Sequence, residues 1–299
     1  MVRLKFFIEL RYAIADYASD FIFNVHAART PCQSVVSENL QISQPVRISS
    51  FVDPANGNRY TRLRAQPGGL VVRYDATVDI AHHVASPDTV GEVPIFELPA
   101  ATLAYIYPSR YCQSDHLQQL AHAEFGNLRP GYWRVRAIQD WVKSRTRFVS
   151  GSSNATTSAV DTLNERVGVC RDFAHLMIAL CRALNIPARF ATGIDYGSDP
   201  AFGPTDFHAY VEAFLGGRWY LFDPSGMALP MGLVRLGTGR DAADVSFATI
   251  FGPVQSEAPY IGVEGIQDSA LGIVLPQACV EALSTEGPEK EAHEMFAAA

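Results

Sequence analysis

One stretch of the sequence places a cysteine at the start of a buried helix, and this stretch constrains the fold most. From Cys170 to Leu184 nearly every residue is a good helix former, and Pro187 then forbids continuation of the helix. The apolar residues cover most of the helix circumference instead of one stripe, which is typical of a core helix. We therefore expect a rigid helix buried in the second half of the chain.

Cys170 lies where a helix favours negative charge. Unpaired backbone N–H groups and the positive end of the helix dipole meet at the N-terminus, so we expect the Cys170 thiol to have a lowered pKa and to ionise more readily than a free cysteine. This would prepare a nucleophile. A lone cysteine in an intracellular chain is more often a small apolar side chain that only packs, so the interpretation depends on whether Cys170 has catalytic partners.

The composition excludes several classes of partner. The chain has 299 residues, of which 48% are hydrophobic and 18% charged, as expected for a globular protein of one or two domains. A net charge of -7 without any Lys/Arg run argues against binding to nucleic acid or to an anionic membrane surface. Charges are scattered through the N-terminus and no apolar run is long enough to span a membrane, so we expect no membrane partner and a cytoplasmic location.

Cysteine and histidine spacing gives no metal or disulfide signature. The five cysteines are odd in number and lack CxxC spacing, which predicts neither a disulfide framework nor a zinc site. His82 and His83 adjoin near the end of a predicted strand, where neighbouring side chains point to opposite faces and cannot ligate one metal. The sequence therefore predicts no metal site.

Residues 1–108 are predicted to form an all-β, sandwich-like domain. Side chains alternate with a period of two from Val2 to about His83, and turn-rich breaks at 53–58 and 66–69 separate the strands without any helical stretch between them. The alternating positions are Leu4/Phe6/Ile8/Leu10/Tyr12, Phe21/Phe23/Val25, Tyr60/Arg62/Arg64 and Val72/Tyr74/Ala76/Val78.

Residues 109–278 are predicted to form an α+β domain, with the cysteine helix packed across an antiparallel sheet. Helical patterns come first and strand patterns follow. The expected helices are 114–126 with Ser114 as N-cap, 131–145, 159–166 capped by Ser158, and 170–184; the expected strands include 189–194, 207–215 and 218–222. The acidic, alanine-rich tail at 279–299 is expected to be mobile.

A predicted hairpin supplies partners for Cys170. The two-residue turn Gly216-Gly217 is a strong hairpin signal and pairs Leu215 with Arg218. In this register His208 and Asp223 are diagonal neighbours on one face, with backbones about 7–8 Å apart, so their side chains can form a hydrogen bond. A turn one residue longer would shift the pairing by one position and place His208 and Asp223 on opposite faces of the sheet.

The three residues together predict nucleophilic catalysis. Cys170 would be the nucleophile, His208 would accept and return the proton, and Asp223 would orient the imidazole. Taken singly, His208 is more often a surface histidine on a strand, and Asp223 more often the end of a strand at an Asp-Pro turn. Their combination with a cysteine at a helix N-terminus favours the catalytic interpretation.

Two motifs carry a family resemblance. The runs GVCRDFAHLMIALCRALNIPARFATG and DFHAYVEAFLGGRWYLFDPSG resemble the transglutaminase-like superfamily, specifically the bacterial transglutaminase-like cysteine proteases, and their cysteine, histidine and Asp-Pro motifs follow the family's order. The segments YPSRYC at 107–112 and GRDAADV at 239–245 are also similar to the family. The resemblance covers roughly residues 60 to 265 and is strongest from 158 to 226.

The resemblance implies a papain-like transglutaminase core and thiol acyl transfer through Cys170, His208 and Asp223, without metal or cofactor. The expected activity is hydrolysis of a peptide or amide bond in a peptide or protein substrate through a thioester on Cys170. Amine transfer to protein glutamine by a true transglutaminase would use the same residues, and a non-catalytic protein-binding module is the alternative from another class. The backbone N–H of Cys170 and a second, unidentified donor are expected to stabilise the oxyanion.

Two further residues of the cysteine motif are assigned structural roles. Asp172 lies in the first helical turn, where its charge suits the helix dipole, and a capping role is favoured. His175 lies on a different helix face from Cys170 and is expected to be a buried, hydrogen-bonded histidine rather than a second base.

Overall fold

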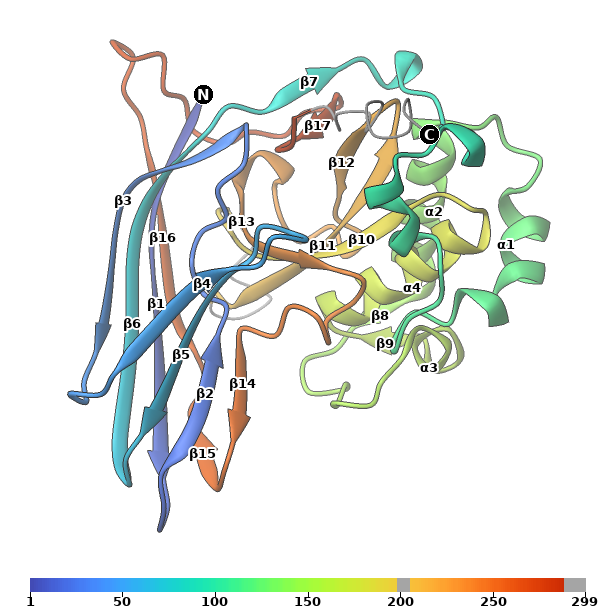
Figure 1. Cartoon of the computed structure of the whole chain (residues 1–299). Coiled ribbons are helices and arrows are strands. Elements are labelled where there is room, and N and C mark those ends of the chain that lie inside the picture. The colour runs from blue at the N-terminus through green and yellow to red at the C-terminus, as the bar shows by residue number, and fades with distance from the viewer. Residues whose placement is uncertain (198–204, 288–299) are drawn as a thin grey trace, which may run out of the picture.

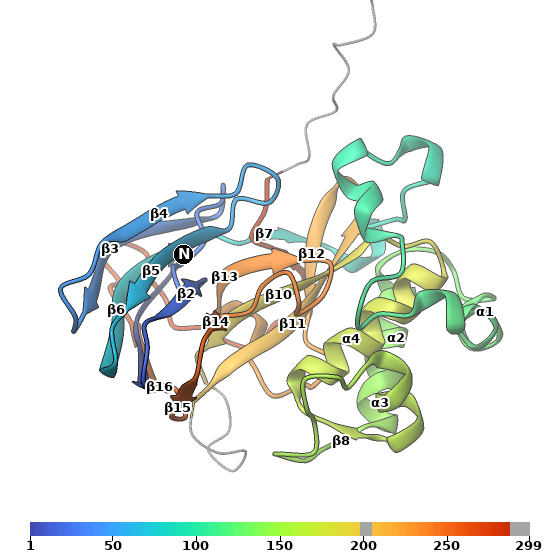
Figure 2. The ribbon, with the colours of Figure 1, turned by 60° about the horizontal axis from the view of Figure 1, so that its bottom comes forward.

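The protein combines a β-rich N-terminal region with an α+β core, as the sequence predicted. The structure, a computed structural model, describes residues 1–197 and 205–287. Figures 1 and 2 show the core sheet lying between the N-terminal strands and the helices. Within the described ranges, every helix is too short or too polar to cross a membrane.

Two antiparallel sheets form the N-terminal region and share one apolar core. Alternate residues of the first strand are buried, as the period of two predicted, and burying a side chain such as Leu4 or Phe6 contributes about 1.5–3 kcal/mol. The strands of the two sheets are β1 (Val2–Ile14), β2 (Ser19–Phe23), β3 (Gln33–Ile42), β4 (Ile48–Val52), β5 (Arg59–Ala65), β6 (Gly68–Ile80), β14 (Ala248–Phe251), β15 (Val254–Ser256) and β16 (Tyr260–Ile266). One sheet has the order β15-β1-β6-β3, with β16 also paired to β1, and the other has the order β14-β2-β5-β4.

The N-terminal sheets include strands from far along the chain, which the predicted division at residues 108 and 278 did not anticipate. β16 pairs with β1 from Arg3↔Ile266 to Glu9↔Tyr260, and β14 pairs with β2. The chain thus returns to the N-terminal sheets after building the core. β3 and β4 were also missed, because β4 is exposed along its whole length and β3 has only one fully buried residue, Gln33.

Among the described residues, the core consists of four α-helices and a four-stranded antiparallel sheet. The elements are α1 (Gln118–Phe125), α2 (Tyr132–Arg145), α3 (Ala159–Glu165), α4 (Cys170–Ala183), β10 (Ala188–Asp195), β11 (Phe207–Leu215), β12 (Arg218–Phe222) and β13 (Leu233–Gly239). The sheet order is β12-β11-β10-β13. α4 contacts β10, β11 and all three other helices, and from Asp172 to Ala183 every residue is buried. The expected core helix is therefore confirmed.

Local signals explain where the helices begin and end. Asp172 caps α4, because its Oδ2 accepts a hydrogen bond from the N–H of Val169 at 2.8 Å. Ser158 caps α3 through a capping box with Asp161, as predicted. Ser114 is not the N-cap of α1: it opens a short 3₁₀ helix, and α1 starts after Leu117.

Part of the C-terminal tail is built into the fold, contrary to the expectation of a mobile segment from residue 279. Its strand pairs antiparallel with a short strand that follows the N-terminal sheets, and residues 288–299 lie outside the described residues. The remaining short elements are β7 (His83–Ala85), β8 (Arg147–Phe148), β9 (Val167–Gly168) and β17 (Ala282–Ser284), with the 3₁₀ helices η1 (Pro87–Thr89), η2 (Ile95–Glu97), η3 (Ala100–Tyr105), η4 (Ser114–His116) and η6 (Pro230–Gly232).

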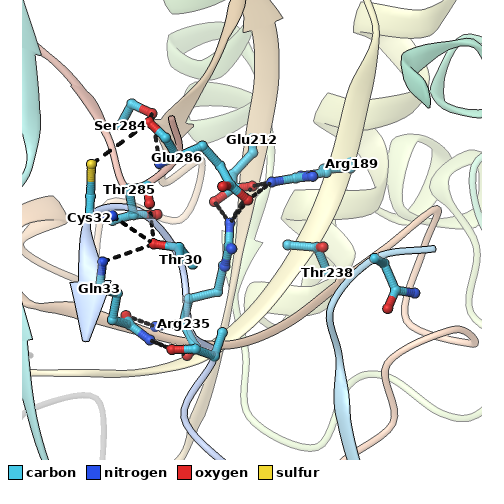
Figure 3. A network of polar contacts seen from close by, with 12 residues as sticks. Thr30, Cys32, Gln33, Arg189, Glu212, Arg235, Thr238, Ser284, Thr285 and Glu286 are labelled. Carbon is cyan, nitrogen blue, oxygen red and sulfur yellow. Dashed lines mark hydrogen bonds and ion pairs between the residues drawn. The ribbon is translucent and has the colours of Figure 1, made fainter. Parts of the chain in front are cut away.

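A buried charge network ties this C-terminal segment to the core sheet (Figure 3). The carboxylate of Glu286 lies 2.9 Å from Arg189 and 2.7 Å from Arg235, and both guanidiniums also pair with Glu212. The two arginines and Glu212 are almost fully buried, so each charge depends on its partners. The segment after β17 therefore contributes a charge to the interior.

Candidate active site

Cys170 is the first residue of α4 and lies against β11. Its Sγ is 3.9 Å from the carbonyl oxygen of Phe207, the residue before His208. Two residues before Cys170, position 168 requires glycine, because a Cβ there would come within 2.7 Å of Asp172 Cβ. The helix cap and the glycine thus set the position of the thiol.

The hairpin has the register predicted from the Gly216-Gly217 turn. Leu215 pairs with Arg218, and the ladder continues to Val211↔Phe222. His208 and Asp223 are brought together as expected: His208 Nε2 lies 3.3 Å from Asp223 Oδ1, and both side chains are buried. The sequence predicted a hydrogen bond between these side chains, and the structure shows them in contact as an ion pair.

A second carboxylate, Asp195 at the end of β10, lies on the other side of the same imidazole. Gly193 pairs with His208 in the β10–β11 ladder, so Asp195 is a diagonal neighbour of His208 on the same face. Its Oδ2 is 3.4 Å from His208 Nδ1. Both ring nitrogens therefore face carboxylates. Asp195 was not among the site residues predicted from the sequence.

Asp223 is held rigidly by its own loop. Oδ1 accepts hydrogen bonds from the Ser225 N–H at 3.0 Å and from the Ser225 hydroxyl at 2.6 Å, and Oδ2 accepts one from the Ala228 N–H at 2.9 Å. Burial acts to raise the pKa of Asp223, but His208 and these hydrogen bonds outweigh it and hold the pKa at about 2. Asp223 is thus a fixed negative charge at neutral pH.

The carboxylates favour the charged form of His208. Burial alone would lower the pKa of His208, but the charge of Asp223 and its hydrogen bond, followed by the charge of Asp195, outweigh burial and raise the pKa. The imidazole therefore retains a proton to higher pH than a free histidine.

The predicted lowering of the Cys170 pKa is wrong for this arrangement. Burial raises the pKa of the thiol to about 12, and the charges of Asp223 and Asp206 act in the same direction. The backbone N–H groups of Ala209 and Arg171 act to lower the pKa but do not offset burial. The helix N-terminus is visible in the sequence, whereas desolvation of the thiol depends on the surrounding fold.

The other two residues of the cysteine motif have the predicted structural roles. Besides capping α4, Asp172 accepts a hydrogen bond from the Ser153 hydroxyl at 3.0 Å. His175 is fully buried, its Nε2 accepts a hydrogen bond from the Ala242 N–H at 3.2 Å, and its ring stacks on Tyr111. Burial lowers the pKa of His175, so this histidine stays neutral.

One cavity joins these groups. It has a volume of about 590 Å³, within the usual range for a ligand site, and its lining includes Cys170, Asp195, Asp206 and His208. Among the described residues, no three side chains of His, Cys, Asp or Glu are arranged to hold a metal ion. A thiol and an imidazole at one cavity, with the imidazole paired to the fixed carboxylate of Asp223, are the groups that covalent acyl transfer requires.

Comparisons with known proteins match both parts of the chain. The model of the transglutaminase-like superfamily matches residues 118–224, and that of the bacterial transglutaminase N-terminal domain matches residues 2–101. The crystal structure of a candidate cysteine protease from Cytophaga hutchinsonii is 40% identical in sequence, covers 95% of this chain and 98% of that chain, and superposes with a TM-score of 0.86. The α+β fold, with a β-rich N-terminal region before a transglutaminase-like core, is therefore confirmed.

Two curated relatives are similar over shorter stretches. An uncharacterised protein of Mycobacterium leprae is 32% identical over 117 residues, which cover 38% of this chain and 42% of the relative. One from Mycobacterium tuberculosis is 30% identical over 143 residues, which cover 44% of this chain and 46% of the relative. The chain thus spans less than half the length of these relatives.

Proposed function

We propose that this chain, which belongs to the transglutaminase-like superfamily, is an enzyme that forms a thioester on Cys170. The observation that carries the proposal is that Cys170, at the N-terminus of α4, lines the same cavity as His208, whose imidazole is paired with Asp223. The substrate is a peptide or protein. The cytoplasmic location stays a prediction from the sequence.

The first chemical step needs His208 to accept the thiol proton. Asp223 is fixed by three hydrogen bonds, so Nε2 keeps its partner and Nδ1, which faces Asp195, is the nitrogen that turns to the thiol. Cys170 Sγ then attacks the carbonyl carbon while His208 carries the proton. The C–N bond breaks, the amine leaves with that proton, and the acyl group remains on sulfur.

The second step releases the acyl group. Water attacks the thioester carbon, His208 takes one proton from the water, and the carboxylic acid leaves as the thiol is restored. With water as acceptor the enzyme is a protease or amidase, which the candidate cysteine protease at 40% identity supports. With an amine as acceptor the same residues would make it a transglutaminase.

The test is the rate of iodoacetamide alkylation of Cys170 against pH, measured by mass spectrometry of the peptide that contains Cys170. Because burial raises the pKa of the thiol, a proton-accepting His208 is needed to make Cys170 reactive at neutral pH. We expect alkylation of the native protein to rise with pH at a point well below the free-thiol pKa of about 8.5. His208→Ala should remove most of this advantage.

His122→Ala is the matched control, since His122 is exposed on α1 and should leave the rate unchanged. A Cys170 that reacts like a free thiol, or not at all, in both the native protein and His208→Ala would contradict the proposal. The binding-module alternative would then be favoured, most directly if Cys170→Ala retained full cellular function.

A further inference from the structure

We propose that the cavity at Cys170 selects substrates with an aromatic or large aliphatic side chain beside the reacting carbonyl. The inference rests on the proposed function and adds the substrate class. Its first support is the chemistry of the cavity lining, which includes the apolar side chains Phe148, Phe190, Phe207, Met227, Val245 and Phe247. Such walls favour an apolar side chain, because its burial removes apolar surface from water.

An aromatic pair lines the same cavity as the nucleophile. The rings of Phe207 and Phe247 stack with centroids 4.3 Å apart and planes 10° from parallel, and both side chains are partly exposed. The carbonyl oxygen of Phe207 is the group 3.9 Å from Cys170 Sγ. A substrate whose carbonyl lies at the sulfur can therefore place its neighbouring side chain in the cavity that this pair lines.

The pair joins the two parts of the molecule. Phe207 opens β11 of the core sheet, whereas Phe247 directly precedes β14, which pairs with β2 of the N-terminal region. Val245, from the same segment, is buried in the apolar cluster around α4. The return of the chain to the N-terminal sheets thus builds one wall of the cavity.

The charged groups of the cavity disfavour an acidic side chain. Among its described lining residues, Asp195 and Asp206 are carboxylates, and Arg171 is the one lysine or arginine. The Arg171 guanidinium already donates to the Ser153 hydroxyl at 2.5 Å and to the Asn154 carbonyl at 2.8 Å. An acidic side chain would therefore meet two carboxylates and a cation that is already engaged.

A basic side chain is also disfavoured. The Asp195 carboxylate lies against His208, and the Asp206 carboxylate accepts the N–H of Phe207 at 2.7 Å. An ammonium group would have to exchange water for aromatic walls while both carboxylates have partners. These contacts leave an apolar side chain as the best fit.

Binding to Cys170→Ala tests the selection separately from catalysis. The probes are three fluorescein-labelled peptide amides of sequence Gly-Gly-X-Gly-Gly with X as Phe, Asp or Lys, followed by fluorescence anisotropy. We expect the Phe peptide to bind at least about tenfold more tightly than the other two, as one apolar pocket typically discriminates. In Cys170→Ala that also carries Phe247→Ala, the difference in affinity between the Phe peptide and the other two should fall to about threefold or less.

Phe251→Ala is the matched control, because Phe251 lies on β14, is 57% exposed and does not line the cavity. Phe247→Leu keeps an apolar side chain and should retain most of the preference, which separates loss of the wall from loss of folding. Equal binding of the three peptides, tighter binding of Asp or Lys, or no binding of any peptide would overturn the inference. Since Cys170→Ala carries no thiol, these outcomes do not depend on the alkylation result.

Discussion

Two carboxylates hold one imidazole at His208, and they differ in how firmly they are fixed. Asp223 accepts three hydrogen bonds besides its His208 contact. Asp195 is the last residue of β10 and lies on the Nδ1 side of the ring. In the proposed reaction Asp223 orients the imidazole throughout. Asp195 favours the protonated imidazole and must give up Nδ1 before that nitrogen can accept the thiol proton.

Asp195→Asn should therefore change the pH dependence of the reaction. The Asp195 charge contributes to the raised pKa of His208, so its removal lowers that pKa. The first step needs a neutral His208 to accept the thiol proton, so activity rises as pH rises through the His208 pKa, and this rise should begin at lower pH in the variant. The measurement is kcat/KM against pH with a substrate that the binding experiment selects.

The control is Asp16→Asn, which removes an exposed carboxylate far along the chain from the site. A uniform loss of activity at every pH, with the acid limb unmoved, would indicate that Asp195 has only a structural role.

At the scale of elements, the hairpin and α4 were predictable because their signals are local. The Gly216-Gly217 turn fixes the register that joins His208 to Asp223, and the residues of α4 specify both its burial and its end. Asp195 was not predictable in the same way. The register between β10 and β11 is set across a connection of about ten residues, so turn chemistry does not determine which residue of β10 faces His208.

The return of the chain to the N-terminal sheets was equally hard to predict from the sequence. The strand pattern at 260–266 was visible in the sequence, but its partner β1 lies more than 250 residues earlier. Pairing at such a separation depends on the folded core that lies between the two segments. The Cys170 pKa was mispredicted for the same reason, since desolvation depends on elements from the whole chain.

The C-terminal segment at β17 should stabilise the core through Glu286. Its carboxylate lies between the buried Arg189 and Arg235, and among the described residues Glu212 is the other carboxylate that pairs with both guanidiniums. We expect Glu286→Gln to lower the free energy of unfolding by about 2 to 3 kcal/mol, because breaking a buried pair leaves a charge uncompensated. Urea unfolding at pH 7 measures this loss.

The same variant has a defined pH dependence. Burial acts to raise the pKa of Glu286, but Arg235 and Arg189 outweigh it and lower the pKa below the ordinary value. The stabilisation is therefore complete above the unfolded pKa of about 4.3 and is lost as pH falls through the lowered folded pKa. The difference between native protein and Glu286→Gln should shrink in acid, while the exposed Glu281→Gln should match the native protein at neutral pH.

At the scale of the whole molecule, the N-terminal region and the core share interior surface. Ile194 of β10 and Val234 of β13 belong to the same apolar cluster as Leu4 of β1. The edge strand β13 is also hydrogen-bonded by N-terminal side chains: the Gln33 amide pairs with both the N–H and the carbonyl of Arg235, at 2.9 and 2.8 Å. These contacts, with the return of β14–β16, predict that the two parts unfold together.

Leu4→Ala tests this coupling, because all three tryptophans lie in the core, at 133, 141 and 219, and none in the N-terminal strands. Leu4 is fully buried, so its truncation should cost about 2 to 5 kcal/mol. If the molecule unfolds as one unit, the urea midpoint followed by tryptophan fluorescence shifts by the same amount as the midpoint followed by far-ultraviolet circular dichroism. Val36→Ala, at a site 52% exposed on β3, should move neither curve. A tryptophan transition that Leu4→Ala leaves in place would show that the core unfolds independently, and the wall around Phe247 would then be held by the core alone.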